Sequence, residues 1–208
     1  MRWEWLGRVP FDDAFAAQEA RRERILEGDT AAEALLFLEH DPVITLGRST
    51  GPADLLVPEA ELARRGIALR RTTRGGSATA HAPGQLVVYP VMRLRRGVLW
   101  HVETIGRAIA DELRGHGIDA SWRRDPAGVW VGDRKIAACG LHVRRRVAIH
   151  GFALNVTRDS LAPFSLIVPC GLASAKVTAL ETERSLAPPS LPALATALAA
   201  RLVPLLNE

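Results

Sequence analysis

Two side chains in this sequence have the chemistry needed for covalent catalysis at neutral pH. Cys170 lies between Pro169 and Gly171, a context that favours a presented thiol. Lys135 is one of only two lysines, with Lys176, among 27 basic residues. The amine of a partly buried lysine can lose its proton, whereas a guanidinium effectively cannot. The two residues therefore indicate a cysteine nucleophile and a lysine that handles protons.

The sequence leaves the partner of the Cys170 thiol open. An ammonium nearby lowers the pKa of a thiol, so Cys170 and Lys135 would form a nucleophile–amine dyad. The spacing is equally compatible with His81 or His150 as the partner. In the simpler interpretation Lys135 escaped the arginine bias by chance and Cys170 fills the core. Cys139, in an expected strand, reads as a small buried residue.

Two further segments have compositions suited to a binding site. The loop 74–85 contains two successive glycines, which allow a ligand to approach the backbone closely. It matches neither the phosphate loop nor the dinucleotide fingerprint, so a simple bend is the alternative. The expected strands 135–143 and 147–156 carry small residues at alternate positions, which predicts either a tight sheet–helix contact or a channel.

Composition places the chain among ordinary globular proteins. Its 208 residues, 48% apolar and 24% charged, predict a single domain over 1–208. The two cysteines give no disulfide framework or zinc spacing, and free thiols suit a cytoplasmic location. No signal core or membrane-spanning segment is expected. With 5% aromatic residues the arginine clusters predict solvated faces rather than nucleic-acid binding, although a net charge of +4 suits an acidic carrier protein.

The hydrophobic periodicity predicts helices and strands that are intermixed without strict alternation, which favours an α+β fold (mixed-sheet α/β). Helices are expected over 12–27, 58–65, 99–113 and 191–206. Strands are expected over 34–39, 43–46, 67–72, 86–91, 128–131, 135–143 and 147–156, with a hairpin turn at 132–134.

Taken together, these segments resemble the lipoyl(octanoyl) transferase family over about half of the chain. The matching motifs, in order, are Arg74-Gly75-Gly76, Thr79, His81, Pro83-Gly84-Gln85, Tyr89-Pro90, Gly128-Val129-Trp130-Val131, Lys135-Ile136-Ala137-Ala138, Gly140, His150-Gly151-Phe152-Ala153-Leu154-Asn155-Val156, Pro169-Cys170-Gly171 and Val177-Thr178.

The resemblance implies a domain similar to the catalytic domain of biotin and lipoate protein ligases. It implies octanoyl transfer from octanoyl-acyl carrier protein, through a thioester on Cys170, to a lysine of a lipoyl domain, as the first step of endogenous protein lipoylation. Lys135 would lower the pKa of Cys170 and act as general acid and base. The implied substrate-binding residues are Arg74, Gly75, Gly76, Ser77, Ala78, Thr79, Ala80, His81, Ala138, Cys139, Gly140, Gly151, Phe152 and Ala153.

A monomer is expected. The resemblance also implies that no metal or cofactor is needed, since the donor thioester is already activated. The implied acceptors are the lipoyl domains of 2-oxoacid dehydrogenase E2 subunits and the glycine cleavage H protein. Backbone amides near Cys170 or at Gly75 and Gly76 are expected to hold the oxyanion. An ATP-dependent lipoate or biotin ligase of the same fold is the alternative.

The sequence departs from the family pattern at a few positions. Ala82 replaces a glycine, which puts the shape of the loop in question because alanine disfavours positive φ. Ala80 replaces an aromatic residue and Cys139 replaces isoleucine or leucine, and both are expected to alter the width of the pocket. Ala179 stands where the family often has serine.

Overall fold

The computed structural model describes residues 1–168, 176–184 and 187–208, so Cys170 lies outside the described residues. Within these ranges the helices are α1 (Phe11–Leu26), α2 (Glu59–Arg64), α3 (Val98–Gly115), α4 (Leu180–Glu183) and α5 (Leu191–Asn207). The strands are β1 (Arg2–Arg8), β2 (Ala34–Glu39), β3 (Val43–Leu46), β4 (Ala68–Arg71), β5 (Ala78–His81), β6 (Gln85–Arg93), β7 (Ala120–Arg124), β8 (Ala127–Val131), β9 (Arg134–Arg144), β10 (Val147–Asn155) and β11 (Lys176–Val177). Short 3-10 segments are η1 (Thr30–Ala32), η2 (Pro52–Asp54) and η3 (Arg158–Leu166).

In the part of the chain that is described, the strands form two sheets. The large sheet has the order β1-β2-β6-β10-β9-β8-β7, with β11 paired to β9, and the small sheet has the order β4-β3-β5. The pairs β1–β2, β3–β4 and β9–β11 are parallel, and the other pairs are antiparallel. The expected α+β fold with mixed sheets is thus confirmed.

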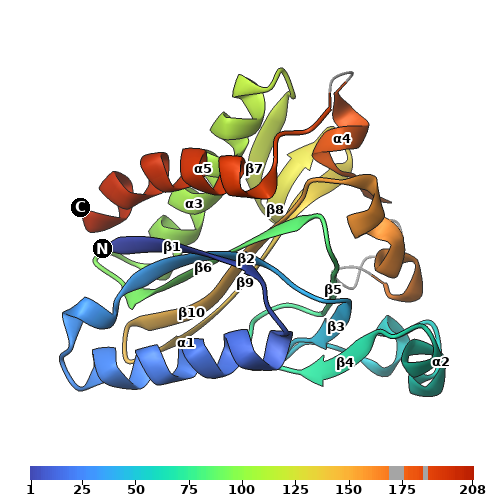
Figure 1. Cartoon of the computed structure of the whole chain (residues 1–208), viewed down its shortest axis with the longest axis horizontal. Helices are drawn as coiled ribbons and strands as arrows, with labels where there is room; N and C mark the ends of the chain where they lie inside the picture. The colour runs from blue at the N-terminus through green and yellow to red at the C-terminus, as the bar shows by residue number, and fades with distance from the viewer. Residues whose placement is uncertain (169–175, 185–186) are drawn as a thin grey trace.

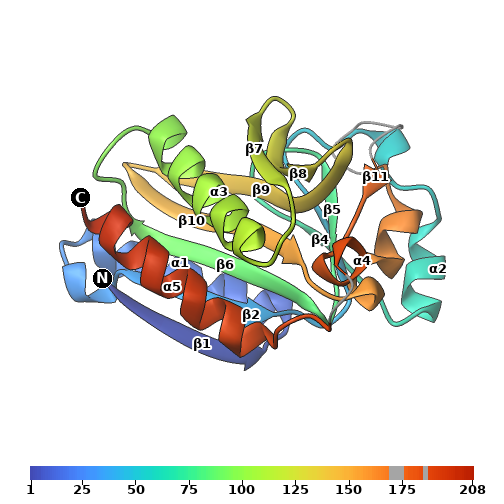
Figure 2. The same ribbon diagram turned by 90° about the horizontal axis from the view of Figure 1, so that it is seen from above.

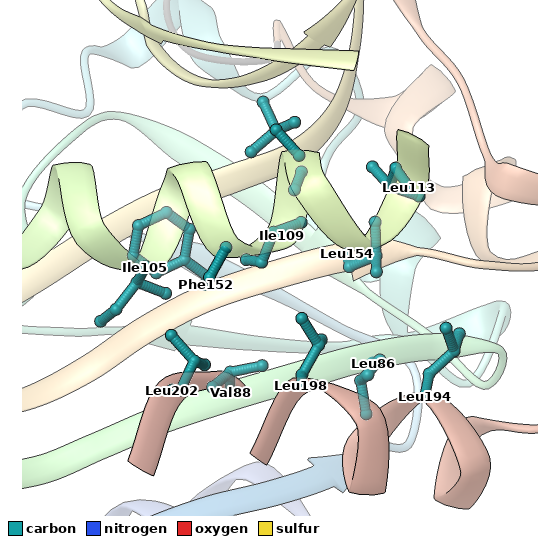
Figure 3. Packing of buried hydrophobic residues seen from close by; sticks show 14 of the residues in the cluster. Leu86, Val88, Ile105, Ile109, Leu113, Phe152, Leu154, Leu194, Leu198 and Leu202 are labelled. Carbon is teal, nitrogen blue, oxygen red and sulfur yellow. The ribbon is translucent and has the colours of Figure 1, made fainter. Parts of the chain in front are cut away.

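Helices cover both faces of the large sheet. Helix α1 lies along one face, while α3 and α5 lie side by side on the other (Figures 1 and 2). Leucines and isoleucines spaced by four residues on α3 and α5 pack onto side chains of β6 and β10, as Figure 3 shows. The labelled residues are Ile105, Ile109, Leu113, Leu194, Leu198, Leu202, Leu86, Val88, Phe152 and Leu154. The four-residue spacing places these side chains on the side of each helix that faces the sheet.

The expected elements are confirmed with small shifts at their ends. Helix α3 ends at Gly115, two residues beyond the expected end, and Gly117 follows with a φ of +79°. The hairpin of β8 and β9 turns at Gly132, whose φ is +56°. The expected loop over 74–85 is wrong in part. The glycine-rich loop ends before Ala78, and Ala78–His81 form strand β5, which pairs with β3. The edge strands β1 and β7 were also missed.

No helix among residues 1–168, 176–184 and 187–208 has the length and apolarity needed to cross a membrane.

Candidate active site

A cavity of about 260 Å³ opens where β9 and β10 meet the glycine loop and the start of α1. It lies between the large sheet and the small sheet, so its wall combines residues far apart in the sequence. The lining residues are Phe11, Arg74, Gly76, Ser77, Ala78, Thr79, His81, Tyr89, Asp125, Pro126, Ala127, Lys135, Ala138, Cys139, Gly140, His150, Gly151, Phe152 and Ala153.

The alternating small residues of β9 and β10 form part of this wall. Their register pairs Ala138 with Ala153 and Gly140 with Gly151. A Cβ added to Gly151 would lie 2.1 Å from the Val88 carbonyl oxygen, so backbone approaches this residue closely. The tight contact and the channel were alternatives in the sequence. The structure places these residues in the wall of the cavity, and the close contact at Gly151 is with the neighbouring strand β6 rather than with a helix.

We expect Gly151→Ala to destabilise the protein by about 1–3 kcal/mol, because the added methyl group meets the fixed backbone of β6. Gly115→Ala is the matched control, since a Cβ at Gly115 has no atom within 4 Å. At this helix end alanine should be neutral or stabilising. Urea unfolding of the two variants measures the difference, and equal stability of both would contradict the steric argument.

The glycine loop is held against the loop after β3. Ser49 donates a backbone hydrogen bond to the Gly76 carbonyl oxygen at 3.1 Å. The buried Arg74 guanidinium donates from Nη2 to the Thr45 carbonyl oxygen at 2.6 Å and from Nε to Thr45 Oγ1 at 3.1 Å. The Gly75 amide donates to the Leu141 carbonyl oxygen at 2.9 Å. The expectation that this amide holds an oxyanion is therefore wrong, because its hydrogen is already bonded.

Lys135 contributes a buried amine to the cavity wall, with 4% of the residue exposed. Its Nζ donates to the Ala127 carbonyl oxygen at 3.0 Å and lies 4.8 Å from the centroid of the Trp130 ring. Gly128, with a φ of +152°, leaves room for the lysine stem, because a Cβ there would lie 3.0 Å from Lys135 Cε. Gly128 and Trp130 of the motif Gly128-Val129-Trp130 therefore contact the Lys135 side chain and define its position.

His150 reaches the cavity through an irregularity in the sheet. The flanking pairs Ala148–Met92 and Phe152–Val88 place His150 opposite Pro90, which has no N–H to give to β10. His150 adopts a φ of +59°, and its amide donates instead to Gln18 Oε1 of α1 at 2.8 Å. The missing N–H of Pro90 in a central strand is therefore matched by the positive φ of His150, whose amide bonds α1 instead of β6.

His81 presents a hydrogen-bond acceptor to the cavity. Its Nδ1 lies 2.6 Å from Gln85 Oε1, while Gln85 Nε2 donates to Asn155 Oδ1 and to the Ala80 carbonyl oxygen. Since the amide oxygen of Gln85 can only accept, Nδ1 carries the hydrogen and Nε2 keeps a lone pair. Burial, with the nearby His40 second, lowers the pKa of His81 to about 3. His81 is therefore neutral at physiological pH.

The buried histidines predict a loss of stability in mild acid. Burial also lowers the pKa of His150 to about 3, with Arg74 as the next cause. Below pH 6.5 the unfolded chain binds protons at these histidines and the folded chain does not, so stability present above pH 6.5 falls as the pH falls. Each such histidine should cost about 1.4 kcal/mol per pH unit in this range. Urea unfolding between pH 7 and pH 5 measures the slope, which His81→Gln should reduce; an unchanged slope in that variant would contradict the assignment.

The cavity brings together most of the residues that the sequence indicated. Of the expected substrate-binding residues, all but Gly75 and Ala80 line it, as does Lys135. Ala80 packs instead in the core of the small sheet with Ile44 and Phe164, so its expected effect on the width of the pocket is wrong. Cys139 does line the cavity and is part-exposed rather than buried.

Several lining residues were not among the expected substrate-binding residues, although His150 was one of the alternative partners for Cys170. Tyr89 and His150 lay in recognised motifs, and Phe11 is the first residue of α1. Residues 125–127, the turn after β7 and the first residue of β8, carry no chemical signal in the sequence, although the Ala127 carbonyl oxygen accepts a hydrogen bond from Lys135. Ala82 is not among the residues with positive φ, so the loop forms without the glycine usual in the family.

The described residues on either side of 169–175 are hydrogen-bonded to the loop after β3 and to strand β9. Before the gap, the Val168 amide donates to the Asp54 carbonyl oxygen at 2.9 Å. After it, Val177 of β11 pairs with Lys135, and the Thr178 amide donates to the Lys135 carbonyl oxygen at 3.0 Å. Asn155 Nδ2 also donates to the Thr178 carbonyl oxygen at 2.9 Å.

This architecture is that of the lipoate and biotin protein ligases. A structure of a bipartite lipoate protein ligase and its E2 lipoyl domain from Thermoplasma acidophilum superposes with a TM-score of 0.73 at 22% identity, covering 99% of this chain and 83% of the other. A biotin protein ligase from Aquifex aeolicus gives a TM-score of 0.55 at 12% identity, covering 100% of this chain and 69% of the other. At these identities the likeness concerns the fold alone.

Sequence comparison narrows the class. Residues 10–202 match the model of the lipoyl protein ligase A/B catalytic domain, and the chain belongs to this family. An octanoyltransferase of Solibacter usitatus is 49% identical over 170 residues, which are 80% of this chain and 76% of the relative. An octanoyltransferase of Dictyoglomus thermophilum is 42% identical over 182 residues, 88% of this chain and 77% of the relative.

Proposed function

We propose that this chain is an octanoyltransferase that moves an octanoyl group from an acyl carrier protein to a lysine of a lipoyl domain, through a thioester on Cys170. The family and the octanoyltransferase relatives support the acyl transfer. The observation that carries the proposal is the buried Lys135 amine in the cavity wall, next to the strand that follows the Cys170 segment.

The reaction proceeds in two displacements. In the first, the Cys170 thiolate attacks the donor thioester carbon, the donor C–S bond breaks, and the carrier protein leaves with its thiol. In the second, the acceptor amine attacks the Cys170 thioester, an amide forms, and the cysteine sulfur leaves. Lys135 gives a proton to the departing carrier sulfur in the first displacement and takes the proton that the acceptor amine loses in the second, while Cys170 leaves as the thiolate; arginine cannot fill this role. Since the donor thioester is activated, the balance requires no nucleotide.

The cavity suits the acyl chain of the donor. About six methylenes at about 0.8 kcal/mol each contribute on the order of 5 kcal/mol when buried. One methylene more or fewer changes this by only about 1–3 kcal/mol, so chain-length selectivity is real but leaky. Cys139 and Phe152, which pair across β9 and β10, both line the cavity and set its width.

The test is transfer without ATP. The protein is incubated with octanoyl carrier protein and a lipoyl domain, and both products are weighed intact. We expect an octanoyl gain on the enzyme first and on the lipoyl domain afterwards. A wild-type enzyme that gains no mass and transfers nothing would overturn the proposal.

The second candidate is an ATP-dependent ligase, because the solved structures of this fold include a lipoate-protein ligase A bound with ATP. That function predicts release of pyrophosphate from free octanoate and ATP. The octanoyltransferase predicts none, so the same reaction mixtures discriminate the two.

The proposal includes the organisation of the enzyme. In this proposal residues 1–208 form one catalytic domain that acts as a monomer in the cytoplasm. The acceptors are the lipoyl domains of 2-oxoacid dehydrogenase E2 subunits and the glycine cleavage H protein.

A further inference from the structure

The loop between β3 and α2 lies between the glycine loop and the chain that leads to Cys170. On one side, the Gly47 amide donates to the Ser77 carbonyl oxygen at 3.3 Å. A Cβ on Gly47 would lie only 2.2 Å from the Gly76 carbonyl oxygen, so the two loops touch backbone to backbone. On the other side, the Leu56 amide donates to the Leu166 carbonyl oxygen at 2.9 Å, and Leu55 forms a β-bridge with Ile167. The same loop thus binds two parts of the proposed site.

Asp54 joins the two contacts. Its carbonyl oxygen accepts the hydrogen bond of the Val168 amide, two residues before Cys170. Its carboxylate oxygen Oδ2 accepts from the Gly51 amide at 2.8 Å and also from the hydroxyl of Ser77, which is buried in the cavity wall. A single residue therefore connects the wall of the cavity with the start of the nucleophile segment.

We propose that Asp54 is a positioning residue for the acyl transfer: through Ser77 and Val168 it fixes where the chain leaves the cavity wall toward Cys170. This inference rests on the proposed function of Cys170. A misplacement of about 1 Å at a reacting group can cost on the order of 100-fold in rate. The Asp54 carboxylate holds its own loop through Gly51 and the wall through Ser77, so its loss releases both contacts together.

Asp54→Ala and Asp54→Asn form the central comparison, in a Cys139→Ala background so that Cys170 is the only thiol. Alanine removes the carboxylate, whereas asparagine keeps an oxygen that can accept from both Gly51 and Ser77. We expect alanine to slow formation of the octanoyl-enzyme at least about 10-fold and to slow alkylation of the Cys170 thiol by iodoacetamide. Asparagine should restore most of both rates.

Two further variants make the comparison specific. Ser77→Ala added to Asp54→Ala should slow the reaction little more than Asp54→Ala alone, because the two residues act through one contact. Asp29→Ala is the matched control, since the Asp29 carboxylate accepts from the Ala31 amide in a similar 3-10 turn. It should leave both rates unchanged.

The proposal is overturned if Asp54→Ala forms the octanoyl-enzyme at the wild-type rate. It is also overturned if asparagine fails to rescue, or if the rates fall only in step with the unfolded fraction measured by circular dichroism. Failure of the proposed function looks different: the wild-type enzyme then gains no octanoyl group, while alkylation of Cys170 still reports whether Asp54 positions the thiol.

Discussion

Cys170→Ala is expected to abolish the octanoyl-enzyme and to reduce transfer to a lipoyl domain by about a thousandfold or more. Without the sulfur the reaction must proceed by direct attack of the acceptor amine on the donor thioester, which forfeits the covalent route. Intact-mass measurement after incubation with octanoyl carrier protein gives the answer directly, because the acyl group adds to the mass of the enzyme.

The second cysteine provides the control for this variant. Cys139 lines the cavity but lies in strand β9, and it has no place in the proposed chemistry. Cys139→Ala should retain the mass gain, with a shift in chain-length preference at most. An undiminished mass gain in Cys170→Ala would exclude Cys170 as the nucleophile.

Lys135→Arg is expected to lower the rate of transfer by about 100-fold or more, although it preserves a positive charge. General acid–base catalysis contributes on the order of 10²–10⁴-fold, and the guanidinium does not exchange protons at working pH. The larger arginine must also fit beside Gly128 and Trp130, so circular dichroism and urea unfolding accompany the rate measurement.

Lys176→Arg is the matched control, because Lys176 is the other lysine of the chain. Its side chain is largely exposed, and Nζ lies 3.0 Å from Asp133 Oδ2. Arginine can form the same ion pair, so activity should remain at the wild-type level. A Lys135→Arg enzyme that is folded and as active as Lys176→Arg would remove proton transfer from the role of Lys135.

The sequence was most informative where periodicity is long. Helices α3 and α5 and strands β6, β9 and β10 follow repeating apolar positions, and burial against the sheet is what that pattern encodes. Strand β5 was hidden by the glycines before it, since Ala78–His81 is too short to show a period and is stabilised by pairing with β3. Edge strands such as β1 face solvent on much of their surface, so their sequences carry a weak signal.

The residues of the candidate site could be predicted where their side-chain chemistry or the order of the motifs pointed to them. The glycine loop, Lys135 and the small residues of β9 and β10 were all indicated, and they do meet at one cavity. Their mutual approach depends on contacts between the two sheets, which no local pattern records. The carbonyl oxygen of Ala127, which bonds Lys135, belongs to the backbone and is invisible in a sequence.

An enzyme that holds an activated acyl ester near amines risks modifying itself. Here the hazard is small for the lysine side chains, because the chain displays nearly all its positive charge as guanidinium groups, which are poor acyl acceptors. Of its two ammonium-bearing lysines, Lys135 is enclosed with its nitrogen bonded to a carbonyl oxygen, and Lys176 is paired with a carboxylate. The bias toward arginine thus leaves one exposed lysine of the chain, Lys176, to compete with the lysine of the acceptor.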